Sequence, residues 1–256
     1  MILSSLEHAL SRPTRLVVCA HASNICPATL PLAAIGRLCH AHGALFAVDA
    51  AQSAGVLDIN MEEMQIDALA VPGHKGLYGP MGVGMLLLGK GIRPDTLLEG
   101  GNGLDSLSGG MGDDLPERYE PGTLPLPAIA GLRAGIEFVR RVTPEAIREK
   151  ETALGVFLRD ALTELPGVHV AVPHLAGGTV LFRADGVSSE DIAARLDAAG
   201  SGICVRPGFH CAALAHRTLG TPEGGAVRAS FGWFNTRRDA EQLIQSLRGG
   251  LPGRNG

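Results

Sequence analysis

The sequence predicts an α/β protein in which a mainly parallel sheet comes first and a smaller α+β domain follows. Two observations favour this fold. Residues 15–90 alternate short apolar runs with a helical pattern, which is typical of parallel strands joined by crossover helices. From residue 143 onward, a long helix is followed by short strands and further helices. We therefore expect a large domain at 1–142 and a small domain at 143–256.

The elements of the first part follow from the positions of the apolar residues. A short helix is expected at the N-terminus, and Leu32, Ile35 and Cys39 share one face of a second helix at 31–42. The apolar runs favour buried strands, because strands covered on both faces carry near-continuous apolar residues. We expect these strands at 15–20, 44–48, 66–71 and 83–88.

Helix signals mark the beginning of the second part. A helix is expected at 126–141, and Thr143-Pro144-Glu145 begins another, since it offers a capping side chain, a proline and an acid in the first turn. The preceding residues 99–123 have few apolar anchors and are expected to form a loop. Further strands are expected at 167–172, 178–183, 202–206 and 225–231, with helices that begin near Ser188 and Thr236.

The composition argues against several classes of protein. The chain has 256 residues and a formal net charge of −4, which does not suit a nucleic-acid surface. Its apolar runs are shorter than the roughly 18 residues that a membrane span needs. The five cysteines are an odd number at irregular spacings, as in proteins of a reducing compartment. We therefore expect a cytoplasmic protein that binds neither nucleic acid nor a membrane.

Polar side chains follow three successive predicted strands. Asn24 comes after the first strand, Asp49 after the second, and His74 and Lys75 after the third. Ligands of open α/β sheets bind at the carboxyl ends of the strands. A lysine amine can form a Schiff base there, and a carboxylate can pair with the protonated ring nitrogen of pyridoxal phosphate (PLP). Each residue alone is also explained by an ordinary turn, but the three strand ends together indicate a cofactor site.

The chain resembles the class V aminotransferases, which are PLP-dependent enzymes of fold type I, and among them the cysteine desulfurases and selenocysteine lyases. The resemblance covers nearly all of residues 15–250. It implies a PLP-dependent transferase-like α/β fold with an incomplete large domain. The matching segments are H-A-S-N at 21–24, V-D-A-A-Q at 48–52, G-H-K-G-L-Y-G-P at 73–80, Y-E-P-G-T at 119–123 and V-R-P-G-F-H-C-A at 205–212.

The resemblance also implies roles for residues around the cofactor. Lys75 holds the cofactor covalently and then moves the α-proton of the substrate, while Asp49 pairs with the pyridine nitrogen. Gln52 and Asn24 form hydrogen bonds on the side of the ring that carries the phenolic oxygen. His74, which we also count as catalytic, contacts the phosphate or its neighbourhood.

The resemblance further implies a homodimer, because Thr123 would reach the phosphate of the other subunit. Complete members of the group carry a long additional segment before H-A-S-N, with a glycine-rich loop and a histidine that stacks on the ring. The resemblance therefore describes an N-terminally truncated enzyme. An edge and an apolar face of its sheet are expected to be exposed.

A cysteine near the C-terminus distinguishes a desulfurase from an ordinary aminotransferase. Cys211 follows His210 and lies near Arg206, and cationic neighbours favour the thiolate form of a cysteine. A thiolate can attack the sulfur of a bound cysteine and give alanine and an enzyme persulfide. Arg228 suits the α-carboxylate of the substrate, with Arg206 in the same or a supporting role. We expect an enzyme of sulfur metabolism that acts on L-cysteine, with a sulfur-acceptor protein as a further partner.

Other interpretations stay open at this point. Another class V aminotransferase, or a selenocysteine lyase, needs most of the same groups. A truncated, non-catalytic subunit of the same fold would explain the missing N-terminal segment. A zinc site among Cys204, His210, Cys211 and His216 lacks the spacing of paired zinc ligands, so we expect no metal.

Overall fold

The structure is a computed structural model that describes residues 2–103, 110–198, 202–221 and 224–250. The contacts within the chain form two units. The first holds the residues up to Cys19, Pro31–Ala51 and Ile59–Arg141, and the second holds Ala20–Leu30, Gln52–Asp58 and the residues from Val142 onward. Two short segments of the N-terminal half therefore group with the C-terminal unit, whereas the sequence suggested one change of domain at 142/143.

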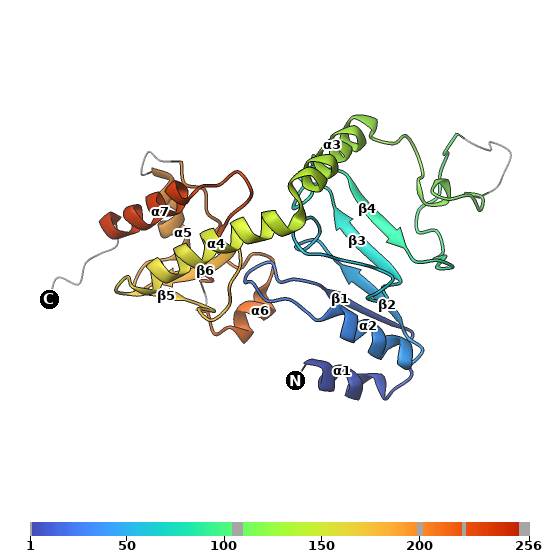
Figure 1. The fold of residues 1–256 in the computed structure, drawn as a ribbon, viewed down its shortest axis with the longest axis horizontal. Helices are drawn as coiled ribbons and strands as arrows, with labels where there is room; N and C mark the ends of the chain where they lie inside the picture. Colours follow the sequence, from blue (N-terminus) through green and yellow to red (C-terminus); the bar gives the residue numbers. More distant parts are fainter. Residues whose placement is uncertain (1, 104–109, 199–201, 222–223, 251–256) are drawn as a thin grey trace. The chain divides into compact units, whose positions relative to one another are not determined.

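Within the described residues, a four-stranded sheet forms the centre of the first unit (Figure 1). Strands β2 and β3 run parallel, and β4 runs antiparallel to β3, as expected for the return strand. Buried and more exposed residues alternate along β2, which places one of its faces in the core. In order across the sheet, the strands are β1 (Leu16–Ala20), β2 (Leu45–Asp49), β3 (Ala68–Pro72) and β4 (Gly84–Leu88).

Part of this sheet carries apolar side chains that face solvent. Leu16 and Val18 of β1 are exposed, and so is Leu86 of β4. Exposed apolar side chains at the edge strands agree with the expectation of an incompletely covered sheet.

Helices α1 (Ile2–Leu10), α2 (Leu32–Ala41) and α3 (Leu126–Val142) also belong to the first unit. α2 packs on β2 and buries the apolar face that its sequence predicted. The backbone passes very close to this helix, since a Cβ atom at Gly36 would lie 2.0 Å from the carbonyl oxygen of Met64. α3 begins and ends within one residue of the expected range.

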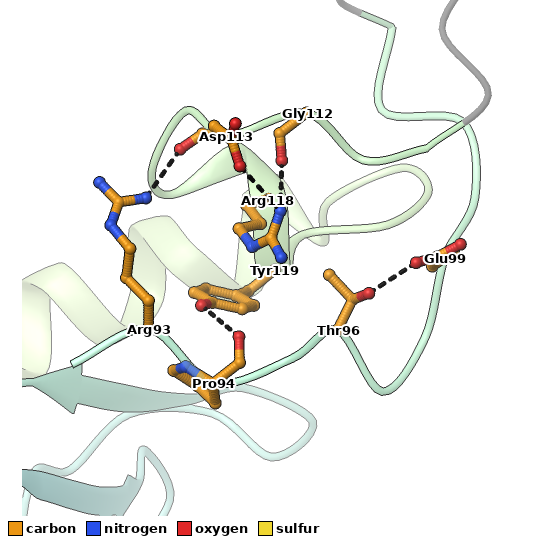
Figure 2. Close-up of polar contacts among 8 residues, drawn as sticks. All are labelled: Arg93, Pro94, Thr96, Glu99, Gly112, Asp113, Arg118 and Tyr119. Atoms are coloured by element: carbon orange, nitrogen blue, oxygen red, sulfur yellow. Dashed lines mark hydrogen bonds and ion pairs between the residues drawn. The ribbon is translucent and has the colours of Figure 1, made fainter.

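The segment between β4 and α3 is held by polar contacts to its own backbone (Figure 2). Arg93 Nη1 donates to the carbonyl oxygen of Asp113 over 3.1 Å, and Tyr119 Oη donates to that of Pro94 over 2.7 Å. Arg118 Nη1 lies 3.1 Å from Asp113 Oδ1 and 2.7 Å from the carbonyl oxygen of Gly112. The structure describes the predicted loop 99–123 except for residues 104–109. The described part of the loop is irregular apart from the short 3-10 helix η1 (Glu117–Tyr119).

The second unit contains an antiparallel sheet in the order β5-β6-β7, packed with helices (Figure 1). The predicted start of its first helix is confirmed, because Thr143 Oγ1 accepts the backbone N–H of Ala146 over 3.2 Å with Pro144 in the first turn. Its elements are α4 (Pro144–Thr163), β5 (Val168–Val170), β6 (Thr179–Ala184), α5 (Ser189–Ala198), α6 (Ala213–Thr218), β7 (Val227–Ser230) and α7 (Arg237–Gly250).

Apolar faces of α4, β6, α5, β7 and α7 form the main core of this unit. A second cluster joins the segment after β1 to β6, through Ile25, Cys26 and Leu181. The burial of Ile25 explains why the segment Ala20–Leu30 groups with this unit.

One sequence-based expectation was wrong in the second unit. Residues 202–206 do not form a strand, because only Arg206 pairs, in an isolated bridge with Arg228. Pro207 and Gly208 follow at once, and proline lacks the N–H that continued pairing needs. The short helix α6 was not expected. Separately, among the described residues, helices are too short or too polar to traverse a bilayer.

Candidate active site

Lys75 lies in a tight glycine-rich turn that follows β3 in the first unit. The N–H of Gly73 donates to the carbonyl oxygen of Val83 over 2.8 Å, and the N–H of Tyr78 donates to that of Lys75 over 2.9 Å. A Cβ atom at Gly73 would lie 2.8 Å from the same Val83 oxygen, so the close approach requires glycine. His74 and Lys75 are exposed, and neither side chain forms a hydrogen bond or ion pair within the part of the chain that the structure describes. The amine of Lys75 is thus available for reaction.

Asp49 leaves the sheet at the same edge as Lys75. It ends β2, which runs parallel to β3 with Asp49 opposite Ala70, so both residues follow carboxyl ends of neighbouring strands. The side chain is exposed, and its Oδ1 accepts the N–H of Ala51 over 2.8 Å. Asp49 therefore caps a turn with one oxygen, the simpler explanation that the sequence allowed, and the other oxygen is directed to no group in the described residues.

Thr123 and Gln52 were also predicted near the cofactor. Thr123 is exposed and follows Gly122, whose φ is 82° and whose N–H donates to the carbonyl oxygen of Gly101 over 2.9 Å. Gln52 is exposed and begins a segment that groups with the second unit. The cofactor roles of both residues stay predictions.

Cys211 lies in a strained turn of the second unit. His210 and Cys211 have φ angles of 54° and 59°, in the left-handed region that favours glycine. Such residues cost about 1–3 kcal/mol each and cluster at functional sites. The thiol is exposed, and Arg206 Nη2 lies 4.0 Å from its sulfur. The structure therefore brings the Arg206 guanidinium near the thiol, and the nucleophilic role of Cys211 stays a prediction.

A closed ring of hydrogen bonds surrounds this turn. Asn24 Nδ2 donates to the carbonyl oxygen of His210 over 2.7 Å, and Arg228 Nη1 donates to the carbonyl oxygen of Asn24 over 2.7 Å. The backbones of Arg206 and Arg228 exchange two hydrogen bonds of 3.0 and 2.8 Å. Asn24 therefore belongs with the cysteine turn, and its predicted contact with the cofactor ring stays a prediction.

Arg228 combines a buried guanidinium with an unused donor. Its Nε is buried and has no hydrogen-bond partner in the described residues, which is rare for a charged group. Burial, and then the positive charge of Arg206, lower the pKa of Arg228. Two guanidinium groups at one place favour an anion, and a carboxylate would satisfy the unused donor.

The ring of His210 is buried and does not lie beside the thiol as a cation. Its Nε2 is 2.8 Å from the carbonyl oxygen of Arg206, and its Nδ1 is 3.1 Å from His216 Nε2. Burial lowers the pKa of His210, and the nearby positive charges add to this effect. Of the two cationic neighbours expected for Cys211, only Arg206 acts as one.

His216 and Thr221 extend this contact inward. His216 is 1% exposed, burial lowers its pKa, and its Nδ1 is 2.7 Å from Thr221 Oγ1. The sequence offered His216 only as a metal ligand and gave no signal for Thr221. Across the described residues, no three His, Cys, Asp or Glu side chains come together in an arrangement that could hold a metal ion.

Similarity to known proteins covers nearly the whole chain. A probable cysteine desulfurase of Methanothermobacter thermautotrophicus is 34% identical over an alignment of 248 positions that covers 94% of this chain and 62% of that protein. One of Chlamydia trachomatis is 34% identical over an alignment of 258 positions that covers 96% of this chain and 61% of that protein.

Solved structures give the same result. The apo cysteine desulfurase of Thermococcus onnurineus NA1 matches with a TM-score of 0.86 and 33% identity, over 96% of this chain and 62% of that chain. The cysteine desulfurase CsdA of Escherichia coli, in an S-sulfonic acid form, matches with a TM-score of 0.87 and 26% identity, over 96% of this chain and 61% of that chain. The chain thus spans about three fifths of the length of these relatives. Residues 1–243 match the model of the aminotransferase class-V family, and the chain therefore belongs to that family.

Proposed function

We propose that this chain acts in a PLP-dependent cysteine desulfurase, in which Cys211 takes the sulfur of L-cysteine and alanine is released. The observation that carries the proposal is the turn of Cys211. An exposed thiol in a strained, left-handed conformation faces a guanidinium at 4.0 Å. An ordinary aminotransferase needs no such group. The curated relatives with the same proposed activity support this assignment.

The residues of the first unit suit PLP. Lys75 offers an amine without a partner in the described residues, and Asp49 offers a carboxylate at the same sheet edge. A pyridine ring with an aldehyde needs this pair, an amine for the aldehyde carbon and a carboxylate for the ring nitrogen. When bound, PLP supplies an electron sink for negative charge on the carbon next to the substrate's amino group.

The residues of the chain then have separate tasks. Lys75 holds the cofactor and moves a proton at the substrate's α-carbon, and Asp49 keeps a proton on the ring nitrogen. Cys211, as a thiolate, attacks the substrate sulfur, so that an S–S bond forms while the Cβ–S bond breaks. The electron pair of the broken bond stays with carbon, which takes up a proton. The products are alanine and a persulfide on Cys211.

Arg228 is proposed to hold the α-carboxylate of the substrate, with Arg206 beside it. The unused buried Nε of Arg228 supports this role, since an anion would satisfy it. The lowered pKa of Arg228 supports it as well, because a carboxylate would offset the repulsion from Arg206. Arg228→Lys should raise KM more than it lowers kcat, since lysine keeps the charge but loses the bidentate contact.

The decisive experiment supplies PLP and L-cysteine to the full chain and measures alanine together with persulfide on Cys211. Cys211→Ala should abolish both products, and Cys204→Ala, which removes another exposed cysteine of the same unit, should leave them unchanged. Alanine release that persists in Cys211→Ala would overturn the persulfide mechanism and favour another class V reaction. Failure of both proteins to bind PLP would favour a non-catalytic subunit.

The cofactor assignment has its own test. Lys75→Ala should remove the absorbance band that PLP gains on binding covalently to an amine. Lys90→Ala is the matched control, because Lys90 is another exposed lysine next to glycine in the same unit. Equal bands in the two variants would show that Lys75 is not the cofactor lysine.

Further assignments remain proposals that follow from this function. A homodimer would allow Thr123 to act across subunits, and a protein acceptor would receive the persulfide sulfur. The five free cysteines are compatible with a cytoplasmic location. Selenocysteine would react at the same groups, so the ratio of kcat/KM for the two amino acids decides between a desulfurase and a selenocysteine lyase.

A further inference from the structure

The turn of Cys211 needs groups that hold it in place. Two successive non-glycine residues, His210 and Cys211, have positive φ angles of 54° and 59°. Such conformations persist only where the surrounding structure fixes them. The Cys211 side chain is exposed and cannot do so. The ring of His210, which is 4% exposed, therefore anchors the turn together with the hydrogen bond from Asn24 to the His210 carbonyl.

The hydrogen bonds of that ring have a defined direction. The carbonyl oxygen of Arg206 only accepts, so His210 Nε2, at 2.8 Å, must carry a hydrogen. Burial lowers the pKa of both histidines, and Arg206 and Arg228 oppose a further positive charge near His210, so both rings are neutral. His210 Nδ1 is then bare and accepts from His216 Nε2 at 3.1 Å.

Thr221 lies at the inner end of this chain of hydrogen bonds. Since His216 Nε2 carries the hydrogen, its Nδ1 is bare and must accept from Thr221 Oγ1 at 2.7 Å. The other acceptor near that hydroxyl, the carbonyl oxygen of His216, is farther away at 3.1 Å. The Arg206 carbonyl thus fixes the direction of this chain of hydrogen bonds, and the Thr221 hydroxyl completes it by donating to the bare Nδ1 of His216.

If the direction of these hydrogen bonds were reversed, the turn would be released. With a hydrogen on His216 Nδ1, His210 would donate from Nδ1 and present a bare Nε2 to the carbonyl oxygen of Arg206. Two acceptors would then face each other across 2.8 Å. The same oxygen accepts the backbone N–H of Arg228 over 2.8 Å, and this bond ties the carbonyl that receives His210 to β7.

We propose that His216 and Thr221 are positioning residues for Cys211, which fix the ring of His210 on the Arg206 carbonyl and so keep the thiol facing the Arg206 guanidinium. The proposal rests on the proposed function only for its effect on sulfur transfer. Its effect on the thiol itself can be measured without cofactor or substrate.

The test compares Thr221→Val, which keeps the shape but removes the hydroxyl, with Thr221→Ser, which keeps the hydroxyl. Alkylation of Cys211 by iodoacetamide in the full chain is followed by peptide mass spectrometry between about pH 6 and about pH 9, because only the thiolate reacts. In Thr221→Val, the rate near neutral pH should fall roughly threefold to tenfold, as one lost buried hydrogen bond implies, and should approach wild type at high pH. In Thr221→Ser it should stay within about twofold.

Two other cysteines serve as internal controls. Exposed Cys204 should react at one rate in all variants, and buried Cys26 should stay unreactive while the second unit is folded. Equal pH profiles for Cys211 in Thr221→Val and wild type would overturn the proposal. A fall of the same size in Thr221→Ser would also overturn it, since the hydroxyl would then be irrelevant.

A measurement on the unaltered chain does not depend on whether any variant folds. Long-range proton–nitrogen NMR spectra of the imidazole rings should show hydrogen on Nε2 of both His210 and His216. Hydrogen on Nδ1 of His210, or a doubly protonated ring at neutral pH, would overturn the proposal. If Cys211→Ala still released alanine from cysteine while Thr221→Val slowed alkylation, the positioning role would stand and the proposed function would fail.

Discussion

Glu151 provides a test of how burial sets the stability of the second unit. Its side chain lies on α4 against the backbone before β6, where a Cβ atom at Gly178 would lie 2.9 Å from Glu151 Cβ and 3.3 Å from its Oε2. Burial raises the pKa of Glu151 from 4.5 to about 7. Below 4.5 the carboxyl is protonated in both folded and unfolded chains. As the pH rises toward about 7, the unfolded chain releases a proton that the folded chain retains, so stability is lost over this window.

The size of the effect follows from the pKa difference. Each pKa unit corresponds to about 1.36 kcal/mol, so the rise from 4.5 to about 7 gives an upper limit of about 3.4 kcal/mol. Because the side chain is only partly buried, solvent screening reduces this value, and we expect about 1–2 kcal/mol. Glu151→Gln keeps the volume and stays neutral. It should match wild type near pH 4.5 and exceed its free energy of unfolding by about 1–2 kcal/mol near pH 8.

Urea unfolding followed by the fluorescence of Trp233 reports on this unit, since Trp233 is the only tryptophan of the sequence. His210 and His216 have lowered pKa values and act in the opposite direction, because the folded unit loses stability as these rings take up protons at low pH. Both rings are present in the variant and in wild type, so their contribution cancels when the two free energies of unfolding are subtracted. Glu149→Gln, an exposed change on the same helix, is the control. Parallel stability curves for Glu151→Gln and wild type from about pH 4.5 to about pH 8 would refute the argument.

Substitutions at two further sites are tested by the same urea titration. Gly155→Ala would place a Cβ atom 1.9 Å from the carbonyl oxygen of Gly177 and should lower the free energy of unfolding by about 1–3 kcal/mol. Gly249→Ala is the control, because its Cβ atom would have no neighbour within 4 Å, and equal effects of the two changes would contradict the close approach. Thr143→Ala removes the acceptor of the Ala146 N–H and should cost about 1 kcal/mol, and Thr143→Ser should retain the cap; a loss in both would place the effect elsewhere.

The regular elements were predictable because their signals are local. The helix that begins at Pro144 has its capping threonine, proline and acid in three consecutive residues. The strands of the first sheet are short apolar runs, and β2 to β4 were expected within two residues of their ends. Lys75 and Asp49 could be paired from sequence because parallel strands end at one edge.

The surroundings of Cys211 were only partly predictable. A cysteine next to His210 suggested a cation beside the thiol, but the side-chain direction depends on two left-handed residues that no local pattern announces. The ring therefore points inward to His216, six positions on. The resemblance implied a cofactor contact for Asn24, which stays a prediction, and no local pattern announced that its amide donates to a residue 186 positions later.

The bond from Asn24 also has a consequence for how the Cys211 turn forms during folding. Its partners His210 and Arg228 lie 186 and 204 positions away, so the turn closes through contacts that span most of the chain. Contacts of such high sequence separation form slowly during folding, because the intervening loop entropy is lost before they contribute. The turn that holds Cys211 therefore cannot close fully until Arg228 has been synthesised, although Asn24 is made early.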